Sequence, residues 1–401
     1  MVFRKTVYIL LIVSLHLSCA SEKPAELVGR WNGYLQLSNV VELPLVFEVT
    51  IQGNDSTFIL INGNERLTYN LQKGRGDNLK VRLEPYDSEL RFTFLDSKIQ
   101  GVWNNLVKGS NYSISFKASP SIEKKRTNEQ GTTSKFEVQF GLGSDAYLAI
   151  LLLKQENKSL SGTIKTETGD YRYLWGKQEG DSIWLACFDG AHAFLFTALQ
   201  KDDSLKNGLF YSGNHYKDTW QAQLSENFEL TDPKELTKAI SDSSFRFSLM
   251  DQNGALIDQT NPIFNNTVTC IQIMGTWCPN CKDETEFLKE IRAKYPEIEL
   301  QIVAAAFEYE KDTAKALARI KHYSNSMNMN YPIYYGGSTN KKKVTEVFPD
   351  LDRVISYPTL VILDKAGKVK QVHTGFNGPA TDEYLEFKKN TTYLIDSLII
   401  I

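Results

Sequence analysis

The chain has 401 residues, a net charge of −3 and 42% hydrophobic residues, which is the composition of a soluble globular protein. The near-neutral charge and the lack of basic runs argue against nucleic-acid binding. The length predicts two or three domains, and the 5 cysteines are few.

The N-terminal residues 1–19 predict a targeting segment. A short positive region precedes a mostly apolar run over 7–17, which is too short to span a bilayer comfortably. The run ends in Ser18 and Cys19, which resembles a lipoprotein signal in which Cys19 is lipidated and becomes the new N-terminus. An ordinary secretory signal cleaved near Ala20 is the alternative. Either signal takes the mature protein out of the cytoplasm into oxidising conditions, and the lipid would anchor it to a bacterial membrane in the periplasm.

Residues 25–225 predict β structure throughout. Short runs of alternating apolar and polar residues are separated by Gly, Asn and Asp, and no long helical pattern interrupts them. A hydrophilic linker over 119–134 divides the region into halves at 25–118 and 135–225. We therefore expect an all-β barrel or sandwich region, followed by a connecting segment over 226–244.

The two halves contain an internal repeat. Residues 76–79, Gly-Asp-Asn-Leu, have an echo in residues 180–183, Gly-Asp-Ser-Ile. Phe92 matches Phe194 at an offset of 102 (194 minus 92). This duplication predicts two related β-meander halves, which either close one barrel or form two small ones.

Two histidines in the second half lie among aromatic and glycine residues. His192 lies in residues 188–194, and His215 lies in residues 211–216. Such residues can line a ligand pocket at a barrel mouth, but turns with half-buried histidines are the alternative interpretation. A metal site made of His192, His215 and Asp189 has no recognisable ligand spacing, so we expect neither a metal nor a cofactor.

The stretch over residues 269–281 contains the reactive chemistry. An apolar run over 268–274 predicts a buried parallel strand, and a helical pattern follows Cys281 until Pro296. Cys278 would therefore lie at a helix N-terminus, where unpaired N–H groups and the helix dipole favour the thiolate. Cys281 lies one turn further on and could attack a mixed disulfide on Cys278. We expect an exposed Cys278 with a lowered pKa as the attacking thiol, and a more buried Cys281 as the resolving thiol.

The pair Cys278 and Cys281 could instead be half of a zinc site. Such a zinc site would need a second pair of ligands. The sequence has no other CxxC or CxxH, so the pattern argues against zinc. Cys187 and Cys270 lie in apolar runs and are predicted to be buried structural thiols. A disulfide between them is the alternative.

Residues 275–281, Gly-Thr-Trp-Cys-Pro-Asn-Cys, resemble the active site of the thioredoxin superfamily, and specifically of the TlpA/ResA-like thiol–disulfide oxidoreductases. Residues 357–369 resemble the cis-proline strand of that family and the hairpin that follows it. The resemblance covers roughly residues 243–390. Asn280 is a departure, because family members often have Pro before the second cysteine.

The resemblance implies an α/β thioredoxin-like domain over 245–395, which agrees with the alternation of predicted strands and helices. It also implies that Trp277 shields the cysteine pair, that Pro279 stiffens the turn and that Pro358 is cis, opposite the disulfide.

Two carboxylates near the motif have open interpretations. Glu308, at the end of the second strand, could face the cysteines and manage a proton, and a solvated strand-end carboxylate is the alternative. Glu284 is interpreted as a favourable charge in the first helical turn.

The function implied by the resemblance is an extracytoplasmic thiol–disulfide oxidoreductase. It would exchange, and most often reduce, disulfides in partner proteins, and a membrane thiol donor would supply its electrons. One alternative is a ligand-binding lipoprotein with an accessory redox domain. The other is a thiol peroxidase, although the Pro-x-x-x-Thr-x-x-Cys pattern of peroxiredoxins is missing, with Ile271 and Gly275 at the Pro and Thr positions.

Overall fold

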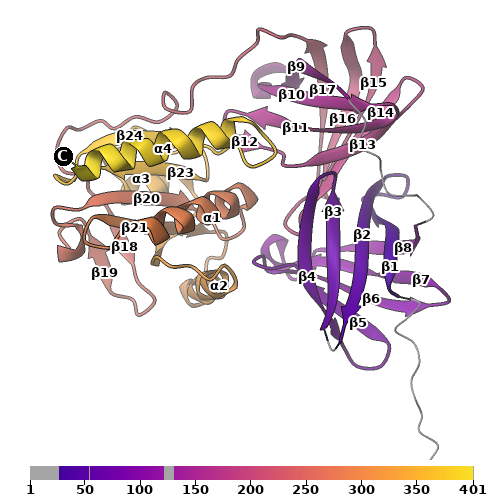
Figure 1. Ribbon diagram of the computed structural model, residues 1–401, viewed down its shortest axis with the longest axis horizontal. Coiled ribbons are helices and arrows are strands. Elements are labelled where there is room, and N and C mark those ends of the chain that lie inside the picture. The colour runs from indigo at the N-terminus through magenta and orange to yellow at the C-terminus, as the bar shows by residue number, and fades with distance from the viewer. Residues whose placement is uncertain (1–26, 54, 122–130, 401) are drawn as a thin grey trace, which may run out of the picture.

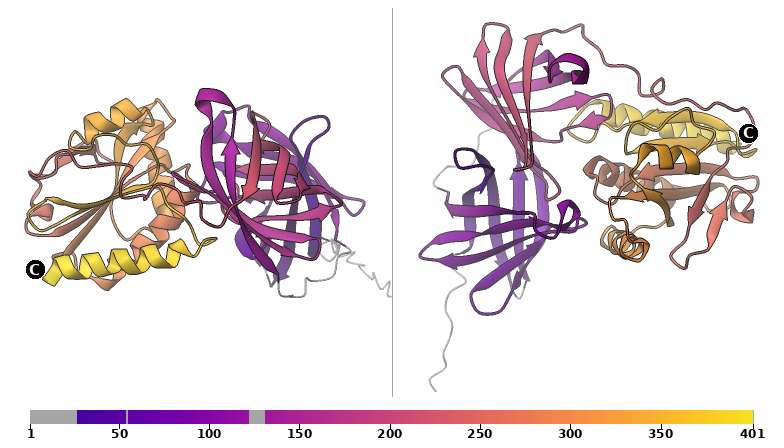
Figure 2. Two further views of the ribbon diagram at one scale, coloured as in Figure 1. Left: turned by 90° about the horizontal axis from the view of Figure 1, so that it is seen from above. Right: turned by 180° about the vertical axis from the view of Figure 1, so that it is seen from behind.

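The computed structural model describes residues 27–53, 55–121 and 131–400 (Figure 1). The predicted signal over 1–19, including Cys19, lies outside the described residues. Two β barrels and an α/β domain make up the described chain, and both barrels lie on the same side of the α/β domain (Figure 2). Among the helices of these ranges, none is long and apolar enough to cross a membrane.

The first barrel is a closed ring of eight antiparallel strands, in which β8 pairs back onto β1. Its strands are β1 (Gly29–Gln36), β2 (Glu42–Gln52), β3 (Asp55–Asn62), β4 (Glu65–Lys73), β5 (Asn78–Arg82), β6 (Ser88–Leu95), β7 (Lys98–Asn105) and β8 (Ser113–Pro120). Because side chains alternate along a strand, every second residue points into the barrel. Trp31, Phe47, Phe58, Trp103 and Phe116 are buried there, so aromatic packing fills the interior.

The second barrel repeats this architecture. Its strands are β9 (Thr132–Phe140), β10 (Tyr147–Glu156), β11 (Ser159–Thr166), β12 (Gly169–Asp170), β13 (Leu174–Glu179), β14 (Ser182–Phe188), β15 (Ala193–Lys201), β16 (Ser204–Ser212) and β17 (Tyr216–Leu224). A pairing of β10 with β11 closes the ring, and the short β12 pairs with the end of β11 outside it.

The internal duplication is confirmed by the order of the strands. Phe92 lies on β6 and Phe194 on β15, and each is the sixth ring strand of its own barrel. The Gly76 and Gly180 turns join the fourth and fifth ring strands in the two barrels. The duplication therefore produces two barrels rather than two halves of one.

The C-terminal α/β domain is built on one mixed sheet. Its elements are β18 (Ser248–Met250), β19 (Leu256–Asp258), β20 (Val268–Met274), β21 (Leu300–Glu308), β22 (Ile333–Ser338), β23 (Thr359–Leu363), β24 (Val369–Thr374), α1 (Pro279–Lys294), α2 (Thr313–Ser326), α3 (Lys341–Val347) and α4 (Glu383–Ile400). The strand order is β19-β18-β22-β21-β20-β23-β24, with β20, β21 and β22 parallel. This arrangement confirms the predicted fold class.

Helices cover both faces of this sheet, which is why β20 and β21 are apolar along most of their lengths. On one face, Phe287 of α1, Ile320 of α2 and Ile395 of α4 pack in one buried cluster with residues of β20. On the other face, Val344 of α3 packs in a second cluster with Ile271. The redox motif follows β20 directly, so the centre of the sheet positions it.

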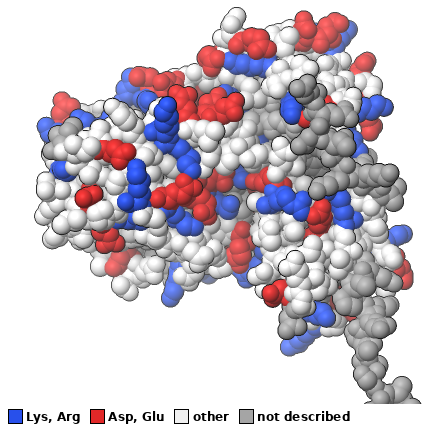
Figure 3. Space-filling view, viewed as in Figure 1, with Lys and Arg blue, Asp and Glu red and all other residues white. Residues whose placement is uncertain are grey.

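The surface seen in Figure 3 intermixes acidic and basic side chains over all three bodies. Polar contacts join the first barrel to α2. Glu84 accepts a hydrogen bond from Ser326 at 3.0 Å and lies 2.6 Å from the His322 ring, and Asp87 lies 3.4 Å from Arg319. The first barrel therefore contacts the α/β domain through α2.

Candidate active site

Cys278 is the N-cap residue of α1, directly after the loop that leaves β20. Its Sγ accepts a hydrogen bond from the backbone N–H of Cys281 at 3.2 Å and donates one to the carbonyl oxygen of Tyr357 at 3.4 Å. Pro279 occupies the first helical position, where its missing N–H costs nothing. The sulfur therefore accepts a hydrogen bond from one of the N–H groups that have no partner within the helix at its start.

The two sulfurs differ in burial. Cys278 is 6% exposed and Cys281 is 0% exposed, and burial raises the pKa of the Cys281 thiol well above its usual range. The expectation of an exposed Cys278 is wrong, because the second barrel covers this end of α1. Cys187 and Cys270 are free and buried, as expected of structural thiols, and burial raises the pKa of Cys270 to about 12.

Trp277 packs beside the cysteines in an aromatic group. Its indole N–H donates to the carbonyl oxygen of Phe307 at 3.0 Å, and its ring lies 4.5 Å from that of Tyr309 and 5.6 Å from that of Tyr357, measured between centroids. A Cβ at Gly275 would lie 2.4 Å from the indole nitrogen, so this close approach requires glycine.

Pro358 lies on the opposite side of the cysteines, at the start of β23. The Tyr357–Pro358 peptide bond is cis. The Tyr357 carbonyl that accepts the hydrogen bond from Cys278 belongs to this bond, so the second sequence motif meets the first in space.

Glu308 is buried at the end of β21, and the solvated alternative is wrong. Its carboxylate accepts hydrogen bonds from the backbone N–H of Thr276 at 3.0 Å and from the Thr276 hydroxyl at 2.9 Å. Burial raises the pKa of this carboxyl to about 7. Glu308 therefore holds the loop that carries the redox motif.

The interpretation of Glu284 as a favourable charge in the first helical turn is wrong. The residue is 0% exposed, and burial raises the pKa of its carboxyl to about 8. Its negative charge would raise the pKa of both Cys281 and Cys270. The sequence did contain a signal, because Glu284 precedes the buried Phe287 and Leu288 at the three- and four-residue spacing of one helix face.

The second barrel forms one side of the redox site, which the sequence did not predict. A cleft of about 160 Å³ lies between the β11–β12 hairpin and the redox motif, and Cys278 lines it. The Asn280 side-chain amide donates to the carbonyl oxygen of Asp170 at 3.2 Å and to that of Phe376 at 3.0 Å. Gly169 has φ +136°, and a Cβ there would lie 2.3 Å from the Asn280 amide nitrogen. The residue that replaces the family's Pro thus holds the barrel against the motif.

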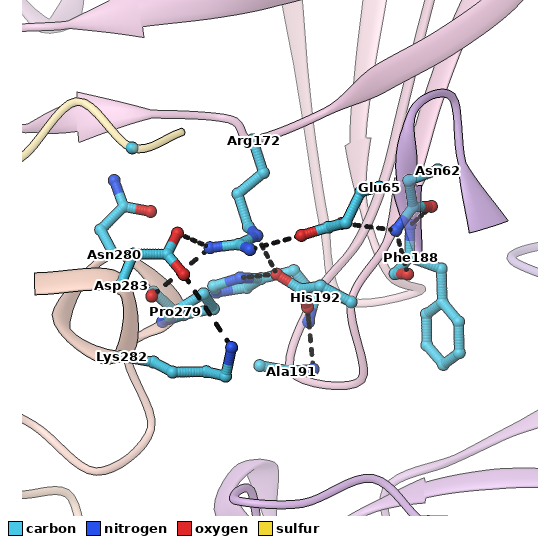
Figure 4. A network of polar contacts seen from close by, with 12 residues as sticks. Asn62, Glu65, Arg172, Phe188, Ala191, His192, Pro279, Asn280, Lys282 and Asp283 are labelled. Carbon is cyan, nitrogen blue, oxygen red and sulfur yellow. Dashed lines mark hydrogen bonds and ion pairs between the residues drawn. The ribbon is translucent and has the colours of Figure 1, made fainter. Parts of the chain in front are cut away.

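Arg172 joins all three bodies beside the redox helix (Figure 4). Its guanidinium bonds Asp283 of α1, and it also bonds Glu65 of the first barrel at 2.7 Å. Asp189, in the second barrel, lies 3.7 Å from the Arg172 Nε. Arg172, Glu65, Asp189 and Asp283, which we call the Arg172 cluster, are all buried to nine-tenths or more of their side chains.

The two candidate histidines do not form a shared site. His192 lines the redox cleft, and its ring lies 3.6 Å from Asp189. The ring of His215 instead lies 3.2 Å from the Tyr112 hydroxyl and 3.0 Å from Lys108. Within the described ranges, no group of three or more His, Cys, Asp or Glu side chains is placed to hold a metal ion.

Comparison with known proteins finds a family model and several relatives that match part of the chain. Residues 236–386 match the Redoxin family model. The chain is 27% identical over 153 residues to the thiol-disulfide oxidoreductase ResA of Bacillus thuringiensis subsp. konkukian, covering 38% of this chain and 78% of ResA. It is 25% identical over 105 residues to the thioredoxin-like protein YneN of Bacillus subtilis, covering 26% of this chain and 55% of YneN. It is 26% identical over 106 residues to the thiol:disulfide interchange protein DsbE of Escherichia coli, covering 26% of this chain and 54% of DsbE. The chain thus spans about half the length of two of these relatives.

Similar solved structures include a putative protein disulfide isomerase from Bacteroides thetaiotaomicron, at 14% identity and a TM-score of 0.32, covering 41% of this chain and 92% of that one. A thioredoxin-family thiol:disulfide interchange protein from Chlorobium tepidum matches at 16% identity and a TM-score of 0.31, covering 40% and 99%. Residues 236–386, which contain the cysteine motif at the start of α1, are thus similar to the Redoxin family, and the chain is similar to thiol–disulfide oxidoreductases such as ResA.

Proposed function

We propose that this protein is a thiol–disulfide oxidoreductase in which Cys278 is the attacking thiol and Cys281 the resolving thiol. The observation that carries the proposal is the position of the Cys278 sulfur. This sulfur caps α1 and accepts a hydrogen bond from the backbone N–H of Cys281 at 3.2 Å. Among the described cysteines, Cys278 alone lines the cleft. The names of ResA and DsbE support the same chemistry.

In the reducing direction, the Cys278 thiolate attacks one sulfur of a partner disulfide. The partner S–S bond breaks, its other sulfur leaves as a thiolate and takes up a proton, and a mixed disulfide remains on Cys278. The Cys281 thiolate then attacks the Cys278 sulfur, and the second partner thiolate leaves. Two electrons have passed to the partner, and a Cys278–Cys281 disulfide has formed. An external dithiol must return these two electrons, and we assign that role to a membrane thiol donor.

Cys281 must lose a proton before it can attack, and burial makes this difficult. We assign Glu284 as the acceptor, because it is a buried carboxyl one helical turn from Cys281 with a pKa raised by burial to about 8. Glu308 acts as a positioning residue through Thr276. Trp277 and Pro358 flank the sulfur, and Pro279 fixes the helix start.

We place the protein in the periplasm, anchored by lipid on Cys19. The support is the sequence of residues 1–19, in which a positive region and an apolar run end at Ser18 and Cys19.

The test is disulfide reduction by the full chain. Pre-reduced protein should reduce insulin, with one Cys278–Cys281 disulfide formed per disulfide cleaved. The Cys278→Ser variant should show no reduction of insulin. Undiminished activity in that variant would overturn the assignment.

A further inference from the structure

We propose that the second barrel is one wall of the substrate site, and that this site takes a cysteine carried on an extended polypeptide segment. The inference rests on the exchange reaction proposed above, and it adds the class of substrate that the site accepts. Residues of the second barrel, which contains neither Cys278 nor Cys281, would therefore help to select the substrate.

Residues from both bodies face each other across the cleft. Thr168, Tyr171, His192 and Phe194 line it from the barrel, and Trp277 and Cys278 line it from the α/β domain. The Tyr171 and Phe194 rings contact each other at 5.0 Å between centroids, and the His192 ring stacks on Phe194 at 4.6 Å. The barrel therefore lines its side of the cleft with aromatic side chains, and Tyr171 and Phe194 also pack on the aromatic core of the barrel.

Contacts to several separate segments hold this wall in place. The Ser356 hydroxyl, just before the cis-proline motif, donates to the carbonyl oxygen of Thr168 at 2.9 Å. The Asp170 carboxylate accepts the backbone N–H of Gly378 at 2.9 Å, and the Tyr173 hydroxyl donates to the carbonyl oxygen of Pro379 at 2.8 Å. Together with the bond from Asn280, these contacts hold the hairpin beside the sulfur.

The dimensions of the cleft restrict what can reach Cys278. The cleft measures about 160 Å³, and the sulfur-bearing residue is 6% exposed. Ligand pockets for drug-sized molecules are about 300–1,000 Å³, so this space holds one or two side chains rather than a domain surface. An extended segment points alternate side chains to opposite sides, so it can direct one cysteine into the cleft while its backbone stays outside. A disulfide on the surface of a folded domain would contact the barrel before its sulfur reached Cys278.

The aromatic wall also predicts the sequence around the substrate cysteine. Tyr171, Phe194 and Trp277 favour apolar or aromatic neighbours, because such pairs gain both buried area and favourable ring geometry. The partner class is thus unfolded or incompletely folded polypeptide, in which a cysteine flanked by apolar residues is accessible.

A crosslinking experiment on the full chain tests the position of the wall. In a Cys281→Ser background, the protein is mixed with a ten-residue peptide that carries one activated cysteine flanked by apolar residues. A photoreactive p-benzoylphenylalanine replaces Thr168, whose side chain is exposed and lines the cleft. The control carries the same residue at Thr133, which is exposed on β9 of the same barrel and does not line the cleft. We expect the trapped peptide to crosslink to position 168 and not to position 133.

A kinetic experiment tests the selection itself, with pre-reduced full chain in single turnover. Thr168→Trp would narrow the cleft but keep the backbone contact to Ser356. We expect it to slow reduction of an unfolded disulfide peptide by about tenfold, because a displaced reacting atom is costly, and to slow reduction of a small aromatic disulfide by a clearly smaller factor. Thr133→Trp should change neither rate. The parent protein should reduce the unfolded peptide faster than the same disulfide in a folded protein.

The outcomes separate this inference from the proposed function. If no mixed disulfide forms on the Cys281→Ser protein, the proposed function fails. If it forms but does not crosslink at position 168, or crosslinks equally at position 133, the barrel is not a wall of the substrate site. If Thr168→Trp slows peptide and small disulfide alike, or if folded and unfolded substrates react at equal rates, selection by the cleft is overturned.

Discussion

The side-chain amide of Asn280, between the two redox cysteines, donates a hydrogen bond to the backbone carbonyl of Asp170 in the second barrel at 3.2 Å. A proline at position 280, as in many TlpA/ResA-like proteins, could make no such bond. The asparagine that departs from the family pattern is therefore the same residue that binds the second barrel.

Asn280→Ala should weaken this docking. The substitution removes hydrogen bonds to Asp170 and Phe376, and each such bond contributes about 0.5–1.5 kcal/mol net, so the free energy of unfolding should fall by about 1–3 kcal/mol. Thermal unfolding gives the loss, and hydrogen exchange should show faster exchange in the β11–β12 hairpin. Asn70→Ala, at an exposed site on β4, is the control and should be close to neutral. An unchanged hairpin in the Asn280 variant would contradict the prediction.

Arg172→Met should be one of the most damaging substitutions in the chain. It leaves Glu65, Asp189 and Asp283 buried without their shared cation, and breaking a buried pair in this way costs about 3–5 kcal/mol. Urea unfolding followed by circular dichroism measures the loss. Arg91→Met is the matched control, because that side chain is 63% exposed and should contribute less than about 1 kcal/mol. Similar losses in the two variants would show that the Arg172 cluster does not hold the bodies together.

Glu284→Gln should change the pH dependence of stability. The folded pKa of Glu284 is about 8, against an ordinary value of 4.5, so the folded state binds more protons than the unfolded state between these values. This residue therefore makes the parent lose stability as the pH rises from about 4.5 to 8, and the variant should lack that part of the decline. Unfolding midpoints across pH 4–9 measure the difference. If parent and variant show parallel curves, the carboxyl does not titrate as described.

The same variant should slow resolution of the mixed disulfide. Without the carboxylate, Cys281 has no buried base, and loss of general-base assistance costs about a hundredfold or more. In the parent, release of the partner should accelerate as the pH rises through about 8, where Glu284 ionises. Rapid-quench measurement of peptide release follows this step. A parent-like pH profile in Glu284→Gln would remove Glu284 from the mechanism.

Cys281→Ser should trap partners on Cys278, because the remaining described cysteines, Cys187 and Cys270, are fully buried. Covalent complexes should accumulate in cells and be released on reducing gels, which would identify the partners. Cys278→Ser should accumulate none. Turnover by Cys281→Ser at the parent rate would mean that another thiol resolves the intermediate.

Cys19→Ser should release the protein from the membrane into the soluble fraction, because the proposed lipid attaches at that sulfur. Fractionation of cells followed by immunoblotting makes the measurement, with Ser18→Ala as a control that keeps the lipidated residue. Membrane retention of the Cys19 variant would contradict lipid anchoring at this position.

The sequence predicted those features that local patterns encode. The run over 268–274, the two cysteines and the helix that follows lie within one continuous stretch, and the barrel duplication is visible as a repeat. The interface was not predictable, because it depends on contacts between distant segments. Arg172 and Asp283 are 111 positions apart, and nothing near either residue marks the other as its partner. The burial of Cys278 was missed for the same reason, since the covering hairpin comes from another body.

The Arg172 cluster also limits how the domains of this chain could be exchanged with those of a relative. The Arg172 guanidinium is shared by carboxylates from two barrels and from α1. The charges at this interface therefore depend on all three bodies. Exchange of the C-terminal domain for that of a relative without an acid at position 283 would remove one of the three carboxylates that Arg172 pairs with. The three bodies therefore cannot be treated as interchangeable modules, and chimeras should fold well only when positions 65, 172, 189 and 283 are transferred together.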